Sequence, residues 1–237
     1  MQQLQEAVLC ANLLLAQSGL VKLTWGNVSA IDREKGLVII KPSGVAYDAL
    51  TAADLAVLTL DGKQLSGKKP SSDTPTHLAL YRAFPSLGGI AHTHSPMAAV
   101  WAQAGLSIPP YGTTHADFAY GEIPCIPALS KAQVQGDYEA ETGSAIAAYF
   151  QKKRLSPDEI PAALLHFHGV FCWGRDAAAA AEAAITLEEI AAMAYHTELL
   201  NSSRSFGGKS AKLPEHILQK HYTRKHGAGA YYGQTED

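Results

Sequence analysis

The stretch Ile90-Ala91-His92-Thr93-His94-Ser95-Pro96 joins a strand pattern to a helix start and carries two histidines. Residues 90–94 have the pattern of a short strand, and Ser95-Pro96 is a typical start for a helix over residues 97–104. His92 and His94 are two residues apart, so in a strand both imidazoles project from the same face of the sheet. Two side chains in that arrangement can bind one metal ion, and the stretch therefore predicts a metal site on a strand.

The segments on either side of this stretch continue the alternation of strands and helices. The polar residues 32–36 lie between two β-rich runs and predict a hairpin, and Asp61-Gly62-Lys63 predicts a second tight turn. The expected strands are residues 24–31, 37–40, 55–60, 64–65, 90–94, 123–126 and 162–173, the last being a strand pair broken at His168-Gly169. The expected helices are an N-terminal one ending near Gly19 and residues 76–84, 97–104, 140–153, 176–200 and 214–226, while residues 111–119 are expected to form an irregular polar loop.

This order of elements indicates the fold class. It contains too many hairpins for a parallel, doubly wound sheet. We therefore predict an α/β fold with a central, mostly antiparallel β-sheet flanked by helices. A chain of 237 residues is near the upper end of what one domain usually holds, and no internal repeat or spacer divides it. We predict a single domain over residues 1–237.

Composition and charge exclude several classes of protein. The chain is 47% hydrophobic and 17% charged with a net charge of -3, which is typical of a soluble globular protein. Lysine and arginine are scattered, apart from short clusters such as Lys68-Lys69, and this is too little for a nucleic-acid-binding surface. No apolar run approaches the roughly 20 residues that a membrane-spanning helix needs. We expect a soluble protein with neither a nucleic-acid partner nor a membrane partner.

The N-terminus and the cysteines indicate the compartment. Residues 8–16 are as apolar as the core of a signal peptide, but the residues before them lack Lys and Arg, include Glu6, and continue at helical spacing. Cys10, Cys125 and Cys172 are odd in number, far apart and in no C-x-x-C pair. They therefore predict neither a disulfide framework nor a cysteine-based zinc site. A reducing cytoplasm fits this pattern best.

A second histidine pair supplies a third candidate ligand. His166 and His168 are again two residues apart, and a carboxylate lies upstream at Asp73. Three imidazoles and one carboxylate suit a zinc-type ion that keeps a position open for substrate. Spacing does not choose between His166 and His168, because in a strand the same face holds both.

Two short loops are candidates for binding an anion. Lys41-Pro42-Ser43-Gly44 and Ser71-Ser72-Asp73 are rich in hydroxyl and backbone N–H donors, and the first adds a lysine. Loops of this kind can bind a phosphomonoester. Serine and glycine are also ordinary turn residues. The phosphate interpretation therefore depends on what the rest of the chain resembles.

The order of the motifs along the whole chain resembles the class II aldolase/adducin-type family and, within it, the L-ribulose-5-phosphate 4-epimerases. The motifs are Thr24-Trp25-Gly26-Asn27-Val28-Ser29, Lys41-Pro42-Ser43-Gly44, Ser71-Ser72-Asp73, His92-Thr93-His94-Ser95, Thr113-Thr114-His115-Ala116-Asp117, His166-Phe167-His168-Gly169, and the C-terminal run from Arg224 to Tyr231-Tyr232-Gly233-Gln234. Each motif is short, but the ordered set is specific. The resemblance implies the three-layer fold of that family.

The resemblance also implies roles for particular residues. It implies zinc as the cofactor, and a three-histidine site also accepts cobalt or manganese. The implied metal residues are His92, His94 and His168, with Asp73 as a fourth group near the ion, which decides the tie in favour of His168. The implied phosphate-binding residues are Asn27, Lys41, Ser43, Gly44, Ser71 and Ser72. The implied acid/base pair is Asp117 and Tyr232, with Thr113 and His221 as neighbours that position the substrate.

In that family the acid/base residues come from an adjacent subunit, so the resemblance implies a homotetramer with active sites at subunit interfaces. The implied substrate is a small sugar phosphate, and the implied reaction is zinc-dependent epimerisation of L-ribulose 5-phosphate to D-xylulose 5-phosphate at C4. The C4 hydrogen is not acidic, so the reaction proceeds by cleavage and re-formation of the C3–C4 bond. Arabinose, ascorbate and gulose catabolism all use this epimerisation, and the sequence does not choose among them.

Three other interpretations compete with the epimerase. L-fuculose- and L-rhamnulose-phosphate aldolases perform the same cleavage but release the fragments, and they usually carry Glu where this chain has Asp73. The epimerases carry Asp at that position. An adducin-type interaction module lacks the histidine set that is present here. A structural zinc site would need four closed protein ligands.

Overall fold

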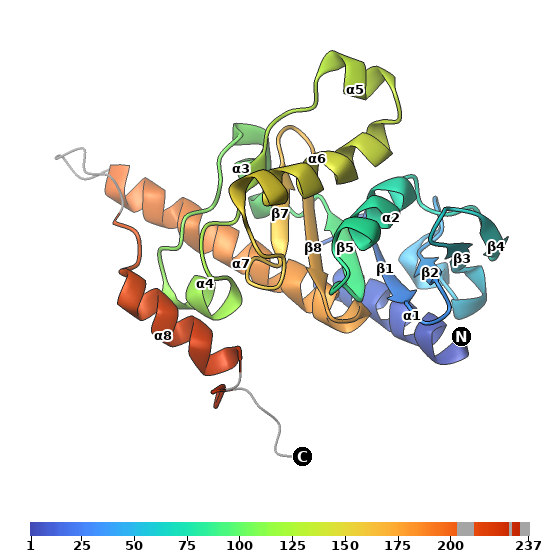
Figure 1. Cartoon of the computed structure of the whole chain (residues 1–237), viewed down its shortest axis with the longest axis horizontal. Coiled ribbons are helices and arrows are strands. Elements are labelled where there is room, and N and C mark those ends of the chain that lie inside the picture. The colour runs from blue at the N-terminus through green and yellow to red at the C-terminus, as the bar shows by residue number, and fades with distance from the viewer. Residues whose placement is uncertain (203–210, 228, 233–237) are drawn as a thin grey trace.

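The computed structural model describes residues 1–202, 211–227 and 229–232 of the chain. Its central element is an eight-stranded sheet with the order β4-β3-β2-β1-β5-β8-β7-β6 (Figure 1). The strands are β1 Asn27–Asp32, β2 Leu37–Ile40, β3 Ala56–Thr59, β4 Gln64–Ser66, β5 Gly89–Thr93, β6 Cys125–Ile126, β7 Ala162–Leu165 and β8 Val170–Gly174.

The pairing of these strands confirms the predicted class of sheet. Every described pair is antiparallel except β6 with β7, which is parallel. The predicted hairpin is β1–β2, and the turn at residues 61–63 joins β3 to β4. β1 begins at Asn27 rather than at residue 24, because Gly26 has a φ of 74° and turns the chain just before the strand.

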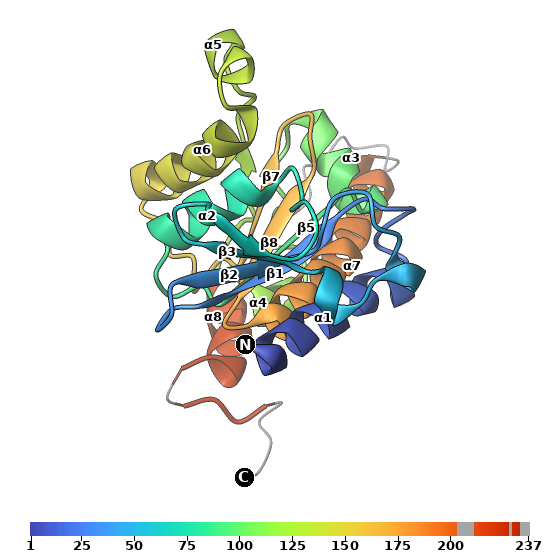
Figure 2. The same cartoon turned by 90° about the vertical axis from the view of Figure 1, so that its right-hand side faces the viewer.

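Helices cover both faces of the sheet, as predicted. They are α1 Gln2–Gln17, α2 Thr74–Ala83, α3 Pro96–Ala104, α4 Thr113–Phe118, α5 Lys131–Gln135, α6 Tyr138–Lys153, α7 Ala177–Ser202 and α8 Glu215–Lys225, with 3-10 turns η1 Tyr47–Ala49 and η2 Ala52–Asp54. α2 packs against α6 on one face, while α7 packs against α1, β5 and β8 on the other (Figure 2). None of the described helices is both long and apolar enough to cross a membrane.

Two helical segments differ from the sequence prediction. The prediction of an irregular loop over residues 111–119 was wrong, because Thr113–Phe118 form α4, which packs against α8 and buries Ala116. A helix of six residues makes fewer than two turns, too few for an apolar period to repeat, and its stability comes from tertiary packing. α5 was also missed, although Ser130 and Gln133 form a capping box at its start.

The middle of the sheet positions the candidate site. β5 lies between β1 and β8, and the register places Asn27 opposite His92 on one side and Phe171 opposite His92 on the other. All three side chains are buried. Residues that are far apart in the sequence are therefore held side by side by backbone hydrogen bonds.

Candidate functional site

One pocket collects the predicted metal-site and phosphate-site residues. It has a volume of about 470 Å³ and lies where the ends of β1 and β5 meet the loops that follow β2 and β7. Its lining residues are Thr24, Trp25, Gly26, Asn27, Lys41, Pro42, Ser43, Gly44, Ser71, Ser72, Asp73, His92, His94, Tyr138, Glu139 and His168. All ten residues expected to bind metal or phosphate are among them.

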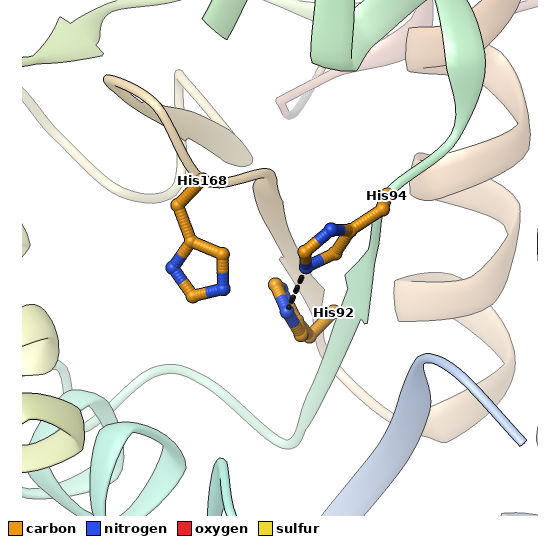
Figure 3. Close-up of side chains that lie close together, drawn as sticks. All are labelled: His92, His94 and His168. Atoms are coloured by element: carbon orange, nitrogen blue, oxygen red, sulfur yellow. Dashed lines mark hydrogen bonds between the residues drawn. The ribbon is translucent and has the colours of Figure 1, made fainter. Parts of the chain in front are cut away.

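Three histidines converge in this pocket. His92 lies on β5, His94 follows the end of that strand, and His168 lies in the turn between β7 and β8. One ring nitrogen from each lies within 4.8 Å of those of the other two, and the rings face a common point (Figure 3). The Nε2 atoms of His92 and His94 are 3.2 Å apart.

The surroundings of His92 fix which nitrogen faces the pocket. Its Nδ1 lies 2.9 Å from the carbonyl oxygen of Val170, so Nδ1 carries the proton and donates it. Nε2 is then the ring nitrogen of His92 that is directed at the other two histidines. The ring also stacks on Phe171, with 4.2 Å between centroids and 18° between planes, which holds its orientation.

The turn between β7 and β8 distinguishes His168 from His166. The prediction that His166 and His168 share a strand face was wrong, since β7 ends at Leu165 and Phe167 has a φ of 67°. His166 stacks on Phe167 at 3.6 Å and lies against Gly105, where an added Cβ would be 2.8 Å from His166 Nε2. His168 lies in the histidine cluster with His92 and His94 (Figure 3).

The electrostatics of the cluster favour neutral imidazoles. Burial, together with the neighbouring histidines His92 and His94, lowers the pKa of His168 to about 4. Burial and His92 also lower the pKa of His94. Lowered pKa values favour the neutral form of His94 and His168, the form in which an imidazole binds a metal, and three converging imidazoles match the ligand set of a zinc-type ion. The residues present therefore fit a divalent metal.

Asp73 lies in the same pocket but outside the group of converging ligand atoms. Its Oδ2 accepts hydrogen bonds from Asn27 Nδ2 at 2.7 Å and Ser71 Oγ at 3.2 Å. Burial raises the pKa of Asp73, but the nearby imidazoles and the Asn27 hydrogen bond outweigh it and leave the pKa below its usual value. A carboxylate at this position adds negative charge beside the histidines.

Lys41 is a buried cation without a carboxylate partner. Its side chain is 1% exposed, and its Nζ lies 3.2 Å from the carbonyl oxygen of Thr24 and 3.5 Å from that of Pro42. Among the described residues, no carboxylate forms an ion pair with it. Burial lowers the pKa of Lys41 to about 8. A buried ammonium without a counterion is unfavourable, so an anion in this pocket would be stabilised.

The two candidate phosphate loops lie next to each other. Ser71 N donates to the carbonyl oxygen of Lys41 at 3.2 Å, and Ser43 N donates to that of Lys69 at 2.9 Å. Pro42 and Pro70 form an isolated antiparallel bridge. The hydroxyl groups of both loops and the ammonium of Lys41 therefore surround one side of the pocket.

The sequence did not single out Tyr138 and Glu139, which also line the pocket. They lie at the start of α6, and the Tyr138 hydroxyl is 3.2 Å from His168 Nδ1. Residues 137–139 carry only the signal of a helix start, and no local pattern relates them to a histidine 30 positions away. Only the packing of α6 brings them there.

The predicted acid/base residues form a second cluster, away from the pocket lining. Asp117 on α4 accepts hydrogen bonds from Arg224 Nε at 2.9 Å and Nη2 at 2.5 Å, and lies 3.1 Å from His221 Nδ1. The Arg224 guanidinium lies 4.3 Å from the centre of the Tyr232 ring. Thr113 is the first residue of α4. None of Thr113, Asp117, His221 or Tyr232 lines the pocket.

Arg224 is the residue that joins this second cluster, and the sequence had shown it only as part of a motif. Its backbone oxygen accepts from the N–H of Tyr231 and Tyr232, so it binds both Asp117 and the C-terminal segment. Ala228, Gly233 and Gln234 of the same motif lie outside the described residues, as do Thr235 to Asp237, which have no predicted role.

Comparisons with known proteins agree with this fold. The profile of the family described as Class II Aldolase and Adducin N-terminal domain matches residues 6–195, and the chain belongs to this family. Among curated relatives, the L-ribulose-5-phosphate 4-epimerases UlaF of Salmonella paratyphi B and Salmonella typhi are each 49% identical over 235 residues, covering 99% of this chain and 100% of theirs. Among solved structures, an L-fuculose 1-phosphate aldolase aligns with a TM-score of 0.75 at 20% identity, covering 94% of this chain and 95% of its own, which shows the shared fold.

Proposed function

We propose that this chain is a metal-dependent L-ribulose-5-phosphate 4-epimerase that forms D-xylulose 5-phosphate. The names of its full-length relatives support the reaction. The observation that carries the proposal is the pocket itself, which combines three converging imidazoles with a buried lysine that has no carboxylate partner among the described residues. These two features suit the two ends of one sugar phosphate, a chelating ketose end and a dianionic phosphate end.

We assign the metal to His92, His94 and His168, with Asp73 beside it, and zinc is the ion that best suits this set. Cobalt or manganese is expected to replace it. A divalent ion bound there would act as a Lewis acid on substrate oxygens and stabilise negative charge. His92 is held by Val170 and Phe171, and this supports a fixed ligand geometry.

We assign the phosphate group to Asn27 and the two adjoining loops. Lys41 contributes the positive charge, and hydroxyl and backbone N–H groups contribute hydrogen bonds. The remaining members of this group are Ser43, Gly44, Ser71 and Ser72. Holding the phosphate would keep the aldehyde fragment in the pocket after the C3–C4 bond breaks.

We assign proton transfer to Asp117 and Tyr232, supplied to the pocket by a neighbouring copy. Burial raises the pKa of Asp117, but hydrogen bonds from Arg224 and His221 bring it below the usual value, so the carboxylate is ionised and able to accept a proton. The C4 hydroxyl loses its proton and the C3–C4 bond breaks, with its electron pair moving onto the C2 carbonyl, so that the enediolate of dihydroxyacetone and glycolaldehyde phosphate form and the aldehyde rotates. The bond then re-forms on the other face, and the C4 oxygen regains a proton. Thr113 and His221 flank this pair.

The separation of the two clusters also bears on the oligomeric state. A neighbouring copy is required if Asp117 and Tyr232 are to reach the histidines, and a homotetramer in the cytoplasm with one domain per chain is the assembly we propose. The observation in its favour is that the two clusters of one chain do not share a pocket.

An assay of the purified protein on L-ribulose 5-phosphate tests the reaction, with D-xylulose 5-phosphate and free glycolaldehyde phosphate both quantified. An epimerase should form the xylulose ester with little free aldehyde. A sugar-phosphate aldolase of the L-fuculose or L-rhamnulose type would release the aldehyde as a stoichiometric product. No conversion of L-ribulose 5-phosphate would reject the proposed substrate.

Replacing Lys41 by methionine should raise KM for the sugar phosphate by about 10- to 100-fold, because a lost charged hydrogen bond costs about 1.5–3 kcal/mol. A lysine with a lowered pKa is charged below that pKa and loses its charge as the pH rises through it. The KM of the unmodified protein should therefore rise as the pH passes above about 8, and Lys41→Met should abolish this rise. Lys152→Met, on exposed α6 surface, is the control. Steady-state kinetics across this pH range decide the point, and an unchanged KM would remove Lys41 from the site.

Replacing Tyr138 by phenylalanine should weaken metal binding by about 10- to 100-fold, the usual effect of losing a hydrogen bond that orients a histidine ligand. Tyr149→Phe, on the same helix but outside the pocket, is the matched control. Metal affinity is measured by competition with a coloured chelator. Equal affinities for both variants would show that Tyr138 does not orient His168.

A further inference from the structure

We propose that Tyr47 is a positioning residue of the phosphate subsite, in which its ring holds the ammonium group of Lys41 and its hydroxyl holds the loop at residues 24–26. The affinity of the pocket for a phosphate dianion then depends on a residue that the substrate does not touch. This inference rests on the proposed function, since it concerns the anion end of the same pocket.

The ring of Tyr47 lies beside the Lys41 charge. Lys41 Nζ lies 4.6 Å from the ring centroid, within the range of a cation–π contact. Both side chains are buried, with Tyr47 7% and Lys41 1% exposed. The contact is therefore screened little by water, and contacts of this kind are strongest when desolvated.

An aromatic ring beside Lys41 differs from a carboxylate in how much of the lysine's positive charge remains available to a ligand. A carboxylate beside Lys41 would cancel its charge and repel a phosphate dianion. The face of Tyr47 stabilises the ammonium through the ring quadrupole, and the positive charge remains available. Nζ has three N–H groups, and the two carbonyl contacts with Thr24 and Pro42 leave one for an anion.

The hydroxyl of Tyr47 fixes the same region from the other side. It lies 2.8 Å from the carbonyl oxygen of Trp25 and 2.9 Å from that of Gly26, so its single proton is shared between them. Burial raises the pKa of Tyr47, which keeps the hydroxyl protonated and able to donate. Trp25 and Gly26 line the pocket, and the preceding Thr24 supplies the carbonyl that accepts from Lys41.

The loop that Tyr47 holds is closely packed at Gly26. Gly26 has a φ of 74°, and an added Cβ would lie 2.9 Å from the backbone oxygen of His92. Asn27 follows directly and begins β1. Tyr47 itself lies in η1, next to the lysine loop in sequence, and is absent from the lining of the pocket. Its position therefore couples the lysine loop to the loop before β1.

Two substitutions separate the ring from the hydroxyl. Tyr47→Leu removes both contacts and should weaken binding of inorganic phosphate by about 5- to 30-fold, the range that a desolvated cation–π contact corresponds to. Tyr47→Phe keeps the ring and should weaken it by about 2- to 10-fold, as expected for one lost hydrogen bond. Calorimetric titration of the metal-loaded, full-length protein with phosphate gives the dissociation constants. KM for L-ribulose 5-phosphate should rise in parallel, with kcat within about twofold.

A double-mutant cycle distinguishes positioning from general destabilisation. If the ring of Tyr47 acts through Lys41, Tyr47→Leu should weaken phosphate binding clearly less in a Lys41→Met background than in the unmodified protein, with no more than the loss seen for Tyr47→Phe remaining. Independent structural damage would instead multiply the two effects. Tyr149→Leu, which removes a tyrosine near Lys153 outside the pocket, is the control and should leave phosphate binding unchanged.

The outcomes separate this inference from the proposed function. Failure of the unmodified protein to bind phosphate or to epimerise the substrate would reject the proposed function. Phosphate binding by the unmodified protein with unchanged dissociation constants for the folded Tyr47 variants would reject the role of Tyr47 alone, as would equal losses in both backgrounds. If Tyr47→Leu does not fold, Tyr47→Phe decides, and an unchanged dissociation constant for that variant overturns the inference.

Discussion

Alanine at His92, His94 or His168 should remove the divalent ion from the protein and lower kcat by about 10³-fold or more, since Lewis-acid stabilisation contributes several kcal/mol to such reactions. Each substitution takes one of three converging nitrogen donors away. Two imidazoles without a third hold zinc weakly in a site that also has to bind substrate. Metal content per chain, measured by plasma mass spectrometry alongside turnover, checks the prediction.

His166→Ala is the matched control, because His166 belongs to the same turn but stacks on Phe167, lies against Gly105 and is not one of the converging ligands. This variant should keep its metal and its activity. His94→Ala is the cleanest of the three test variants, since His94 is exposed and its removal leaves no buried cavity. Loss of metal from His166→Ala with retention in His168→Ala would reverse the assignment in this turn.

Tyr232→Phe and Asp117→Asn should each keep metal and fold while lowering kcat by about 10²- to 10⁴-fold, the usual effect of losing a general acid or base. Neither residue lines the pocket of its own chain, so each is expected to serve a neighbour's metal. Inactive His94→Ala chains mixed with inactive Tyr232→Phe chains should therefore recover activity. With random exchange, about one site in four would pair an intact metal site with an intact Tyr232.

A second mixture provides the control for this complementation. Arg224 binds Asp117 and contacts Tyr232 within one chain, so both residues are expected to enter the same active site. A mixture of Tyr232→Phe and Asp117→Asn chains should then stay inactive, because every site would carry one defective group. Activity is measured after subunit exchange by mild unfolding and refolding. Absence of recovery in the first mixture, once mixed oligomers are demonstrated, would place Tyr232 outside a shared site.

Local patterns in the sequence were enough to predict most elements of the fold. The hairpin at β1–β2, the strand β5 and the long helix α7 follow from periodicity, turn residues and caps, which act over a few residues. The failures were α4 and α5, which are too short to show a period. Their stability depends on contacts that a local pattern does not contain.

The sequence by itself determined the residue types of the site: the two histidine pairs, the lysine and serine loops, and their order along the chain. Tertiary structure decided between His166 and His168, which spacing leaves open and only the resemblance had resolved, because the left-handed conformation at Phe167 leaves His168 in the cluster and His166 against Gly105. It also decided that Lys41 is buried against Tyr47 without a counterion, and that Asp117 lies outside the pocket. The burial of a side chain and the distance between residues remote in the sequence are determined only when strands and helices pack. These two quantities decide which groups of the site are charged and which atoms each group can contact.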